Sequence, residues 1–310
     1  MNTDMVLILG VTASGKGRLA FELAEQTDAE IISIDSMKVY RRMNIGTAKP
    51  PPQARQRIRY HLIDVVEPSE SFSVGRFLDL AYEAIEQIKH RSRKIIAVGG
   101  TALYIKALLY GLFEGPGNDE NIREQLKQQA QTDGLQQLYS ELGEIDPAAA
   151  ERIHPNDSKR IIRALEVYRL SGKPISQLQQ QFNAENPRQN WTIIGLRRER
   201  SEENTRINKR VKKMIDEGLV DEVRDLLAEK KLLSKQARCA IGYAEIINYL
   251  NGNTNLEDAI ELIKKNSRRL AKNQRTWFRS FKNVNWLDIE PQQPDEKIFT
   301  RTMDLLSNLK

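Results

Sequence analysis

A glycine-rich segment at residues 10–17, with the sequence Gly-Val-Thr-Ala-Ser-Gly-Lys-Gly, has the residue types that bind phosphate. It follows an apolar run at residues 5–9, which predicts a buried strand, and precedes an amphipathic stretch at residues 18–25, which predicts a helix. Glycines in such a turn let backbone N–H groups face an anion, and Lys16 adds a full positive charge. The segment therefore predicts a phosphate-binding loop, with a purely structural glycine turn as the alternative.

Position 17 departs from the usual form of this loop, in which a serine or threonine hydroxyl reaches a magnesium ion. Gly17 has no side chain, so water or another residue would take that place, or the metal would be held less tightly. No metal ligand is assigned with certainty for that reason. One cysteine and three histidines are too few for a zinc cluster.

Two further polar residues follow apolar runs that predict strands. Asp35 comes directly after residues 30–34, and Thr101 follows residues 94–98 and two glycines. Ligands of open α/β sheets bind outside the carboxyl ends of the strands, so both side chains are candidate ligand contacts. Both also suit a helix cap or a turn, and their position alone does not decide between the two roles.

The net charge of +6 is concentrated late in the chain, where residues 264–282 carry eight lysines and arginines and no acid. Four of them recur at helical spacing on a helix expected over about 256–282: Arg268, Lys272, Arg275 and Arg279. A basic helix containing Trp277 suits contact with an RNA backbone and stacking on bases. A second group, Lys159, Arg160 and Arg163, lies where cations oppose the dipole of a predicted helix, which favours phosphate contact. A solvated helix face is the alternative for both groups.

The pattern of strands and helices predicts an α/β fold with an insertion. Strand and helix signals alternate until the glycine-rich residues 111–117, polar helical segments fill about 118–190, and strand character returns at 191–196. We expect a P-loop NTPase-like core with a mainly parallel sheet at 1–114 and 191–310, and an all-helical insertion domain at 115–190. Residues 41–60 are expected to form a surface loop over the site.

The composition indicates the class of protein and its cellular compartment. The 310 residues are 29% charged and 40% hydrophobic, which is typical of a globular chain, and no apolar run is long enough for a membrane span. The first residues do not form an export signal, and a single cysteine fits a reducing compartment. We therefore expect a cytoplasmic protein. The residues alone indicate a phosphate-binding enzyme with a nucleic-acid partner, and the missing hydroxyl at Gly17 argues against a kinase.

Taken together and in order, the motifs resemble those of the tRNA dimethylallyltransferase family over essentially the whole chain. The matching runs are Gly10–Lys16, Asp35–Tyr40, Met43–Pro50, His61–Asp64, Phe72–Val74, Gly99–Tyr104, His154–Arg160, Arg163–Val167, Ile241–Tyr243 and Gln274–Arg279. The resemblance implies transfer of a dimethylallyl group from dimethylallyl diphosphate to N6 of the adenosine 3′ of the anticodon, in tRNAs that read codons starting with U. It also implies Mg²⁺ as cofactor, an insertion that grips the anticodon stem-loop, and action as a monomer.

The resemblance assigns roles position by position. It makes Asp35 the base, with Thr101, Lys16 and Arg210 at the reacting centre. The diphosphate contacts it implies are Gly10, Val11, Thr12, Ala13, Ser14, Gly15, Lys16, Gly17, Arg206 and Arg210. The tRNA contacts it implies are Asp35, Ser36, Met37, Lys38, Thr101, Arg123, Lys159, Arg160, Arg163, Cys239, Gly242, Tyr243, Lys272, Arg275 and Arg279.

The chain departs from the family pattern at six positions: Val11, Gly17, Lys38, Cys239, Ala244 and Asn273. None of them is a residue to which the resemblance assigns the chemistry, so we predict an active enzyme. The alternatives are an adenylate isopentenyltransferase acting on free AMP, ADP or ATP, a P-loop kinase, and a non-catalytic relative that binds tRNA.

Overall fold

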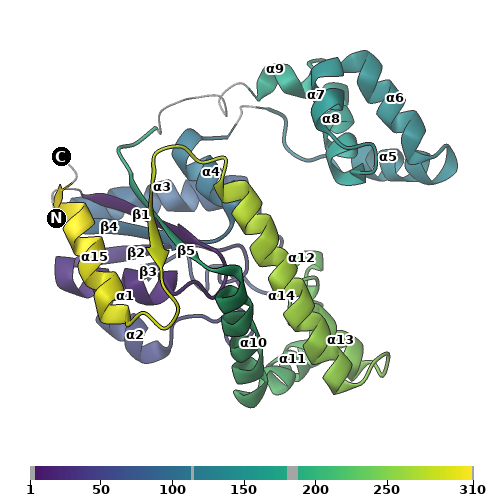
Figure 1. The fold of residues 1–310 in the computed structure, drawn as a ribbon. Helices are drawn as coiled ribbons and strands as arrows, with labels where there is room; N and C mark the ends of the chain where they lie inside the picture. Colours follow the sequence, from purple (N-terminus) through teal and green to yellow (C-terminus); the bar gives the residue numbers. More distant parts are fainter. Residues whose placement is uncertain (1–3, 113–114, 180–187, 309–310) are drawn as a thin grey trace. The chain divides into compact units, whose positions relative to one another are not determined.

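The computed structural model describes residues 4–112, 115–179 and 188–308 (Figure 1). The chain divides into two compact units, a core unit of residues 1–109 and 189–310 and a helical unit of residues 110–188. The expected domain boundary at 114/115 touches residues 113–114, which lie outside the described residues, as does the 180–187 part of the expected insertion.

The core unit is built on one six-stranded sheet, and every strand pairing described in it is parallel. The strand order is β3-β2-β4-β1-β5-β6. The strands are β1 (Met5–Gly10), β2 (Ala29–Ile34), β3 (Tyr60–His61), β4 (Lys94–Gly99), β5 (Thr192–Arg198) and β6 (Val284–Ile289). The prediction of an α/β fold with a mainly parallel sheet is confirmed.

Helices cover both faces of this sheet, which explains why every residue of β1 and β2 is buried. On one face, α1 (Lys16–Thr27) and α15 (Asp295–Asn308) pack on a shared apolar cluster that includes Val6, Ile8 and Ile194. On the other face, α3 (Val74–His90) contacts β2 and β4, and α14 (Leu256–Phe278) contacts β1 (Figure 1). The carboxyl ends of the strands, where the turns lead into α1 and α4, are left for the site.

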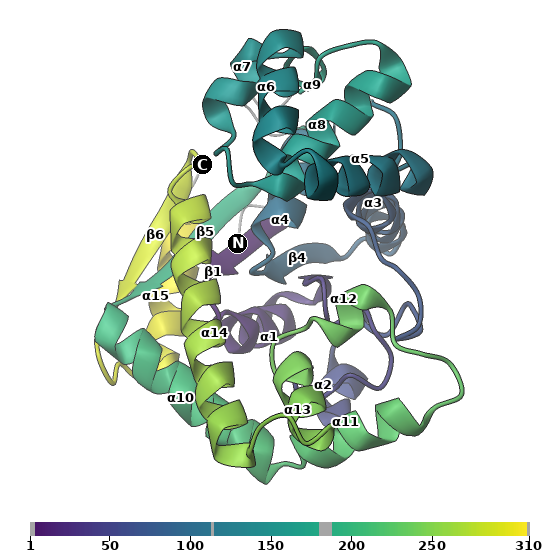
Figure 2. The same ribbon diagram turned by 90° about the vertical axis from the view of Figure 1, so that its right-hand side faces the viewer.

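A second group of core-unit helices lies between β5 and β6 in the sequence. These are α10 (Arg200–Asp216), α11 (Leu219–Ala228), α12 (Lys235–Arg238), α13 (Tyr243–Leu250) and α14. Figure 2 shows α14 running alongside α10 and α13, with which it makes extensive contacts. The remaining short helices of the unit are α2 (Pro52–Arg57) and α4 (Ala102–Tyr110), the latter ending at the start of the helical unit.

The helical unit has its own small core. Its elements are α5 (Glu120–Thr132), α6 (Leu135–Ile145), α7 (Pro147–Arg152), α8 (Ser158–Ser171) and α9 (Ile175–Leu178). Leu126, Leu138 and Leu165 are fully buried between α5, α6 and α8. Among the helices described in the whole chain, none is both long and apolar enough to cross a membrane.

Candidate active site

The predicted phosphate-binding loop joins β1 to α1 and has the backbone shape of an anion site. Ala13 (φ 62°) and Gly15 (φ 99°) both take the left-handed conformation, which glycine adopts without strain. Lys16 is the first residue of α1, and its Nζ donates to the carbonyl oxygen of Val11 at 3.1 Å. The free N–H groups of the first helical turn and the Lys16 ammonium therefore face the same space.

Two arginines from distant elements hold the outside of this loop. Arg206 on α10 donates from Nε to the carbonyl oxygen of Ala13 at 2.8 Å, and Arg198 at the end of β5 donates from Nε to that of Ser14 at 3.0 Å. Arg198 also forms an ion pair with Glu202 at 2.6 Å. These contacts add positive charge beside the loop and fix the direction of its carbonyl groups.

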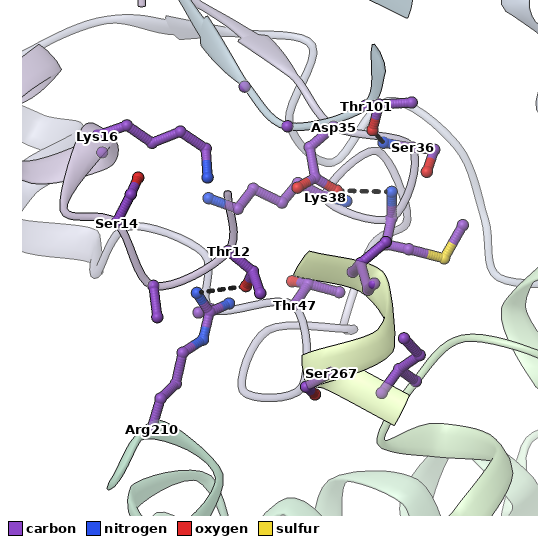
Figure 3. A pocket seen from close by; sticks show the side chains of 18 of the residues that line it. Thr12, Ser14, Lys16, Asp35, Ser36, Lys38, Thr47, Thr101, Arg210 and Ser267 are labelled. Atoms are coloured by element: carbon purple, nitrogen blue, oxygen red, sulfur yellow. Dashed lines mark hydrogen bonds between the residues drawn. The ribbon is translucent and has the colours of Figure 1, made fainter. Parts of the chain in front are cut away.

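Asp35 lies in the turn after β2, next to the turn after β4. Its Oδ1 accepts hydrogen bonds from the backbone N–H groups of Met37 at 2.8 Å and Lys38 at 3.1 Å. The N–H of Ser36 donates to Oγ1 of Thr101 at 3.2 Å, which ties the two turns together (Figure 3). Because β2 and β4 are neighbours in a parallel sheet, residues that are 66 positions apart come to the same edge.

Three cations surround this single carboxylate. Figure 3 shows Lys16 and Lys38 reaching toward one another, and Arg210 donates to Oγ1 of Thr12 at 3.4 Å. Burial, together with the charges of Arg210 and Lys38, lowers the pKa of Lys16 to about 7. Burial is also the main cause that lowers the pKa of Lys38 and of Arg210, and Asp35 opposes it in both. A multiply charged anion would relieve this repulsion, so the arrangement suits such an anion.

These groups open into one cavity of about 1140 Å³ within the core unit. Its walls include the loop from Thr12 to Gly17, the Asp35–Lys38 turn, Thr101, Arg206 and Arg210, together with apolar side chains such as Val211, Met214 and Leu270. Of the residues predicted to contact tRNA, Cys239 and Gly242 also line it. The site thus combines charged groups for an anion with apolar surface.

Within the segment expected as a surface loop, residues 41–60, residues 43–46 are held against the core unit. Met43 is fully buried, and the carboxylate of Glu222 on α11 accepts hydrogen bonds from three successive backbone N–H groups, those of residues 44–46, at 2.8–3.2 Å. Tyr243 donates to the same carboxylate at 2.6 Å and is fully buried against Gly46. Tyr243 therefore supports this wall of the cavity from behind and does not line it.

The basic stripe on α14 is divided between two surroundings. Arg268 donates to Asn208 of α10 at 2.7 Å, and Arg275 pairs with the buried carboxylate of Glu203. Lys272 and Arg279 are exposed. The stripe contains no acid within its own segment, but the tertiary structure supplies one from another helix.

The cations predicted in the helical unit are divided in the same way. Glu166 on α8 is fully buried and forms ion pairs with Arg123 at 3.0 Å and Arg163 at 2.7 Å. Lys159 and Arg160 are exposed at the start of the same helix. Arg123 and Arg163 therefore pair with a buried carboxylate, whereas Lys159 and Arg160 are exposed, and the partner of Arg160 is the partly exposed Asp157 at 3.3 Å.

The donor set fits a magnesium ion that takes most of its ligands from a bound diphosphate and water. No cluster of three or more potential metal-binding side chains occurs in the described part of the chain. Gly17 is exposed, with open space where a side chain would project. Nearby, Oγ of Ser14 is buried without a hydrogen-bond partner, so a hydroxyl of the loop is free for a ligand. Mg²⁺ commonly binds through substrate phosphates and few protein groups.

Sequence reasoning missed four residues that hold the site or its surroundings. They are Arg198, Glu222, Gln274 and Glu166. Gln274 and Glu166 lie within motif runs that the sequence singled out, so their positions carried a signal. Arg198 and Glu222 carried none, because the loop segments that they hold, at Ser14 and residues 44–46, lie more than 170 residues away in the chain.

The chain is similar to known proteins in its family motifs, its sequence and its fold. Residues 38–281 match the model of a family described as IPP transferase. A tRNA dimethylallyltransferase 2 of Geotalea uraniireducens is 47% identical over 284 residues, covering 92% of each chain. A tRNA dimethylallyltransferase of Acetivibrio thermocellus is 45% identical over 296 residues, covering 95% of each chain.

Solved structures share the fold. The full-length tRNA isopentenylpyrophosphate transferase of Bacillus halodurans is 40% identical with a TM-score of 0.71, over 98% of this chain and 96% of that one. A eukaryotic dimethylallyltransferase, described as acting on tRNA, is 27% identical with a TM-score of 0.81, over 99% of this chain and 81% of that one.

Proposed function

The chain belongs to the IPP transferase family, and from this premise we propose that it is a tRNA dimethylallyltransferase. It would transfer the dimethylallyl group of dimethylallyl diphosphate to N6 of the adenosine 3′ of the anticodon, in tRNAs that read codons starting with U. The observation that carries the proposal is a single carboxylate, Asp35, facing Lys16, Lys38 and Arg210 beside a phosphate loop in one cavity.

The cations and the loop hold the donor and its leaving group. The N–H groups of residues 15–17, with Lys16 and Arg210, bind the diphosphate, and Arg206 keeps the loop in shape through its bond to Ala13. As the C1–O bond breaks, its electron pair passes to the diphosphate oxygen, whose growing negative charge these cations stabilise. Mg²⁺, when bound with the diphosphate, would supply further charge neutralisation, and the Ser14 hydroxyl, which is buried without a hydrogen-bond partner, would help to hold it.

Asp35 acts on the acceptor. The exocyclic amine of adenine is a weak nucleophile because its lone pair is delocalised into the ring. As the bond from N6 to C1 of the dimethylallyl group forms, N6 must lose a proton, and the Asp35 carboxylate receives it. The product is N6-dimethylallyl-adenosine and free diphosphate. Thr101, which accepts a bond from Ser36, holds the turn that carries this base.

The acceptor base must leave the anticodon stack to enter the cavity, which costs a few kcal/mol that other contacts have to offset. We propose that exposed Lys272 and Arg279 on α14, and Lys159 and Arg160 in the helical unit, contact the tRNA backbone. Arg123, Arg163 and Arg275 would contribute through their ion pairs, which hold the neighbouring helices in place. The protein is proposed to act as a cytoplasmic monomer.

An acceptor assay tests the proposal. The protein is incubated with dimethylallyl diphosphate, Mg²⁺ and either unmodified tRNA or AMP, and the digested product is examined by mass spectrometry for N6-dimethylallyl-adenosine. Product from tRNA alone is expected. Product from AMP alone would assign the chain to the free-nucleotide enzymes, and tRNA binding without product would make it a non-catalytic relative.

A further inference from the structure

The side chain of Gln274 bridges the two turns that form the site. It lies on the last third of α14, is 7% exposed, and uses both ends of its carboxamide. Oε1 accepts from the backbone N–H of Thr12 at 2.8 Å, and Nε2 donates to the carbonyl oxygen of Gly100 at 2.9 Å. Thr12 belongs to the turn after β1, and Gly100 to the turn after β4.

The Gln274 carboxamide packs closely against Gly100 in the turn after β4. A Cβ at position 100 would lie 2.5 Å from Nε2 of Gln274 and 3.5 Å from Nζ of Lys16, so a side chain there would push the Gln274 carboxamide aside. Because β1 and β4 are adjacent, with Leu9 opposite Gly99, the two turns lie side by side at the sheet edge. The side chain of Gln274 therefore joins the two turns by a hydrogen bond to the backbone of each.

The bridge connects the donor and acceptor sides of the reaction. On one side, Thr12 receives the Arg210 guanidinium on its hydroxyl. On the other side, Gly100 precedes Thr101, which bonds to Ser36 beside Asp35. Any change in the distance between the two turns changes the distance between the diphosphate cradle and the base.

We propose that Gln274 is a positioning residue that sets this distance for the transfer reaction. The inference rests on the proposed function. Its chemical requirement is specific, because the site needs one acceptor for Thr12 and one donor for Gly100 at the end of the same arm. A glutamine meets both needs, an ionised carboxyl meets only the first, and a methionine of similar size meets neither.

The test compares Gln274→Met and Gln274→Glu with a matched exposed position on the same helix, Thr276→Ala. Affinity for dimethylallyl diphosphate is measured by calorimetry, kcat and KM with tRNA are measured at pH 6 and pH 8, and folding is followed by Tm. Gln274→Met is expected to lower kcat/KM by about 10- to 100-fold, since two buried backbone groups lose their partners. Thr276→Ala is expected to match the wild type.

Gln274→Glu separates the hydrogen bonds from packing. A protonated carboxyl donates to Gly100 and accepts from Thr12, as the glutamine does, whereas the ionised form still accepts from Thr12 but repels the Gly100 oxygen. The ratio of variant to wild-type kcat/KM should therefore be higher at pH 6 than at pH 8. A structural defect alone would leave that ratio unchanged.

Two results would overturn the inference. The first is a ratio of Gln274→Glu to wild-type kcat/KM that is the same at pH 6 and pH 8. The second is a Gln274→Met variant whose donor affinity and turnover equal those of the wild type. If the wild type itself forms no product from tRNA, the proposed function fails. The calorimetric comparison of donor binding would still decide whether Gln274 positions the loop.

Discussion

Binding of dimethylallyl diphosphate should be coupled to uptake of a proton by Lys16. Burial and neighbouring cations lower the pKa of this lysine to about 7 in the free protein. At pH 8 it would then be about one-tenth protonated, and at pH 6 about nine-tenths. A bound diphosphate favours the charged form and raises its pKa again, so the complex holds more protons than the free protein. Donor affinity should therefore be highest at or below pH 7 and fall by up to about tenfold per pH unit above it.

Calorimetry of donor binding at pH 8 measures this coupling. The observed enthalpy, compared between buffers of different ionisation enthalpy, should give uptake of about 0.9 proton per site. The ligand itself contributes little at this pH, since a phosphate of this kind loses its last proton at a pKa of about 6. Lys16→Met should abolish most of the uptake, and Lys212→Met, an exposed lysine of α10 that does not line the cavity, should keep it. Zero uptake by the wild type, or unchanged uptake in Lys16→Met, would refute the reasoning.

Three other predictions address the base, the loop and the basic stripe. Asp35→Asn should lower kcat by about 10²–10⁴-fold while donor affinity stays within a few-fold, and normal turnover would exclude Asp35 as the base. Gly17→Thr should strengthen the dependence on Mg²⁺ or the binding of the donor without loss of stability, because the position has open space around it. Titrations with Mg²⁺ and with dimethylallyl diphosphate measure both effects. Lys272→Ala should weaken tRNA binding and reduce its salt dependence with little change in Tm, whereas Arg275→Ala, which strands buried Glu203, should lower stability by about 3 kcal/mol. If Lys272→Ala and Arg275→Ala had equal Tm values, Arg275 would not have the structural role that its ion pair with Glu203 indicates.

The strand-loop-helix at the start of the chain was predictable because its signals are local. The apolar run of β1, the glycines of the loop and the periodicity of α1 all occur within 27 residues, and each depends only on backbone conformation and burial. The same holds for Asp35 and Thr101, whose place at the strand ends follows from two apolar runs. Family resemblance rested on motifs of this local kind, and the comparisons confirm it.

Contacts between distant segments were not predictable from the residues alone. The partner of Arg275 is Glu203, 72 residues away, so the local sequence indicated only RNA contact or a solvated helix face for the stripe and no buried ion pair. Tyr243 lies in a motif run, and nothing in that run indicates that its ring is buried against Gly46. Residues 41–60 carry prolines and charges typical of a surface loop, yet Glu222 of α11 anchors them.

The sequence by itself determined the α/β class, the phosphate loop and the family, because these depend on local patterns of burial, charge and backbone freedom. Only the tertiary structure decided which charges are available to a ligand and which are already paired. It also decided that Gln274, 262 residues from Thr12, joins the two turns of the site. Such pairings depend on the packing of whole helices against the sheet, which brings together side chains whose spacing along the chain carries no information about their distance.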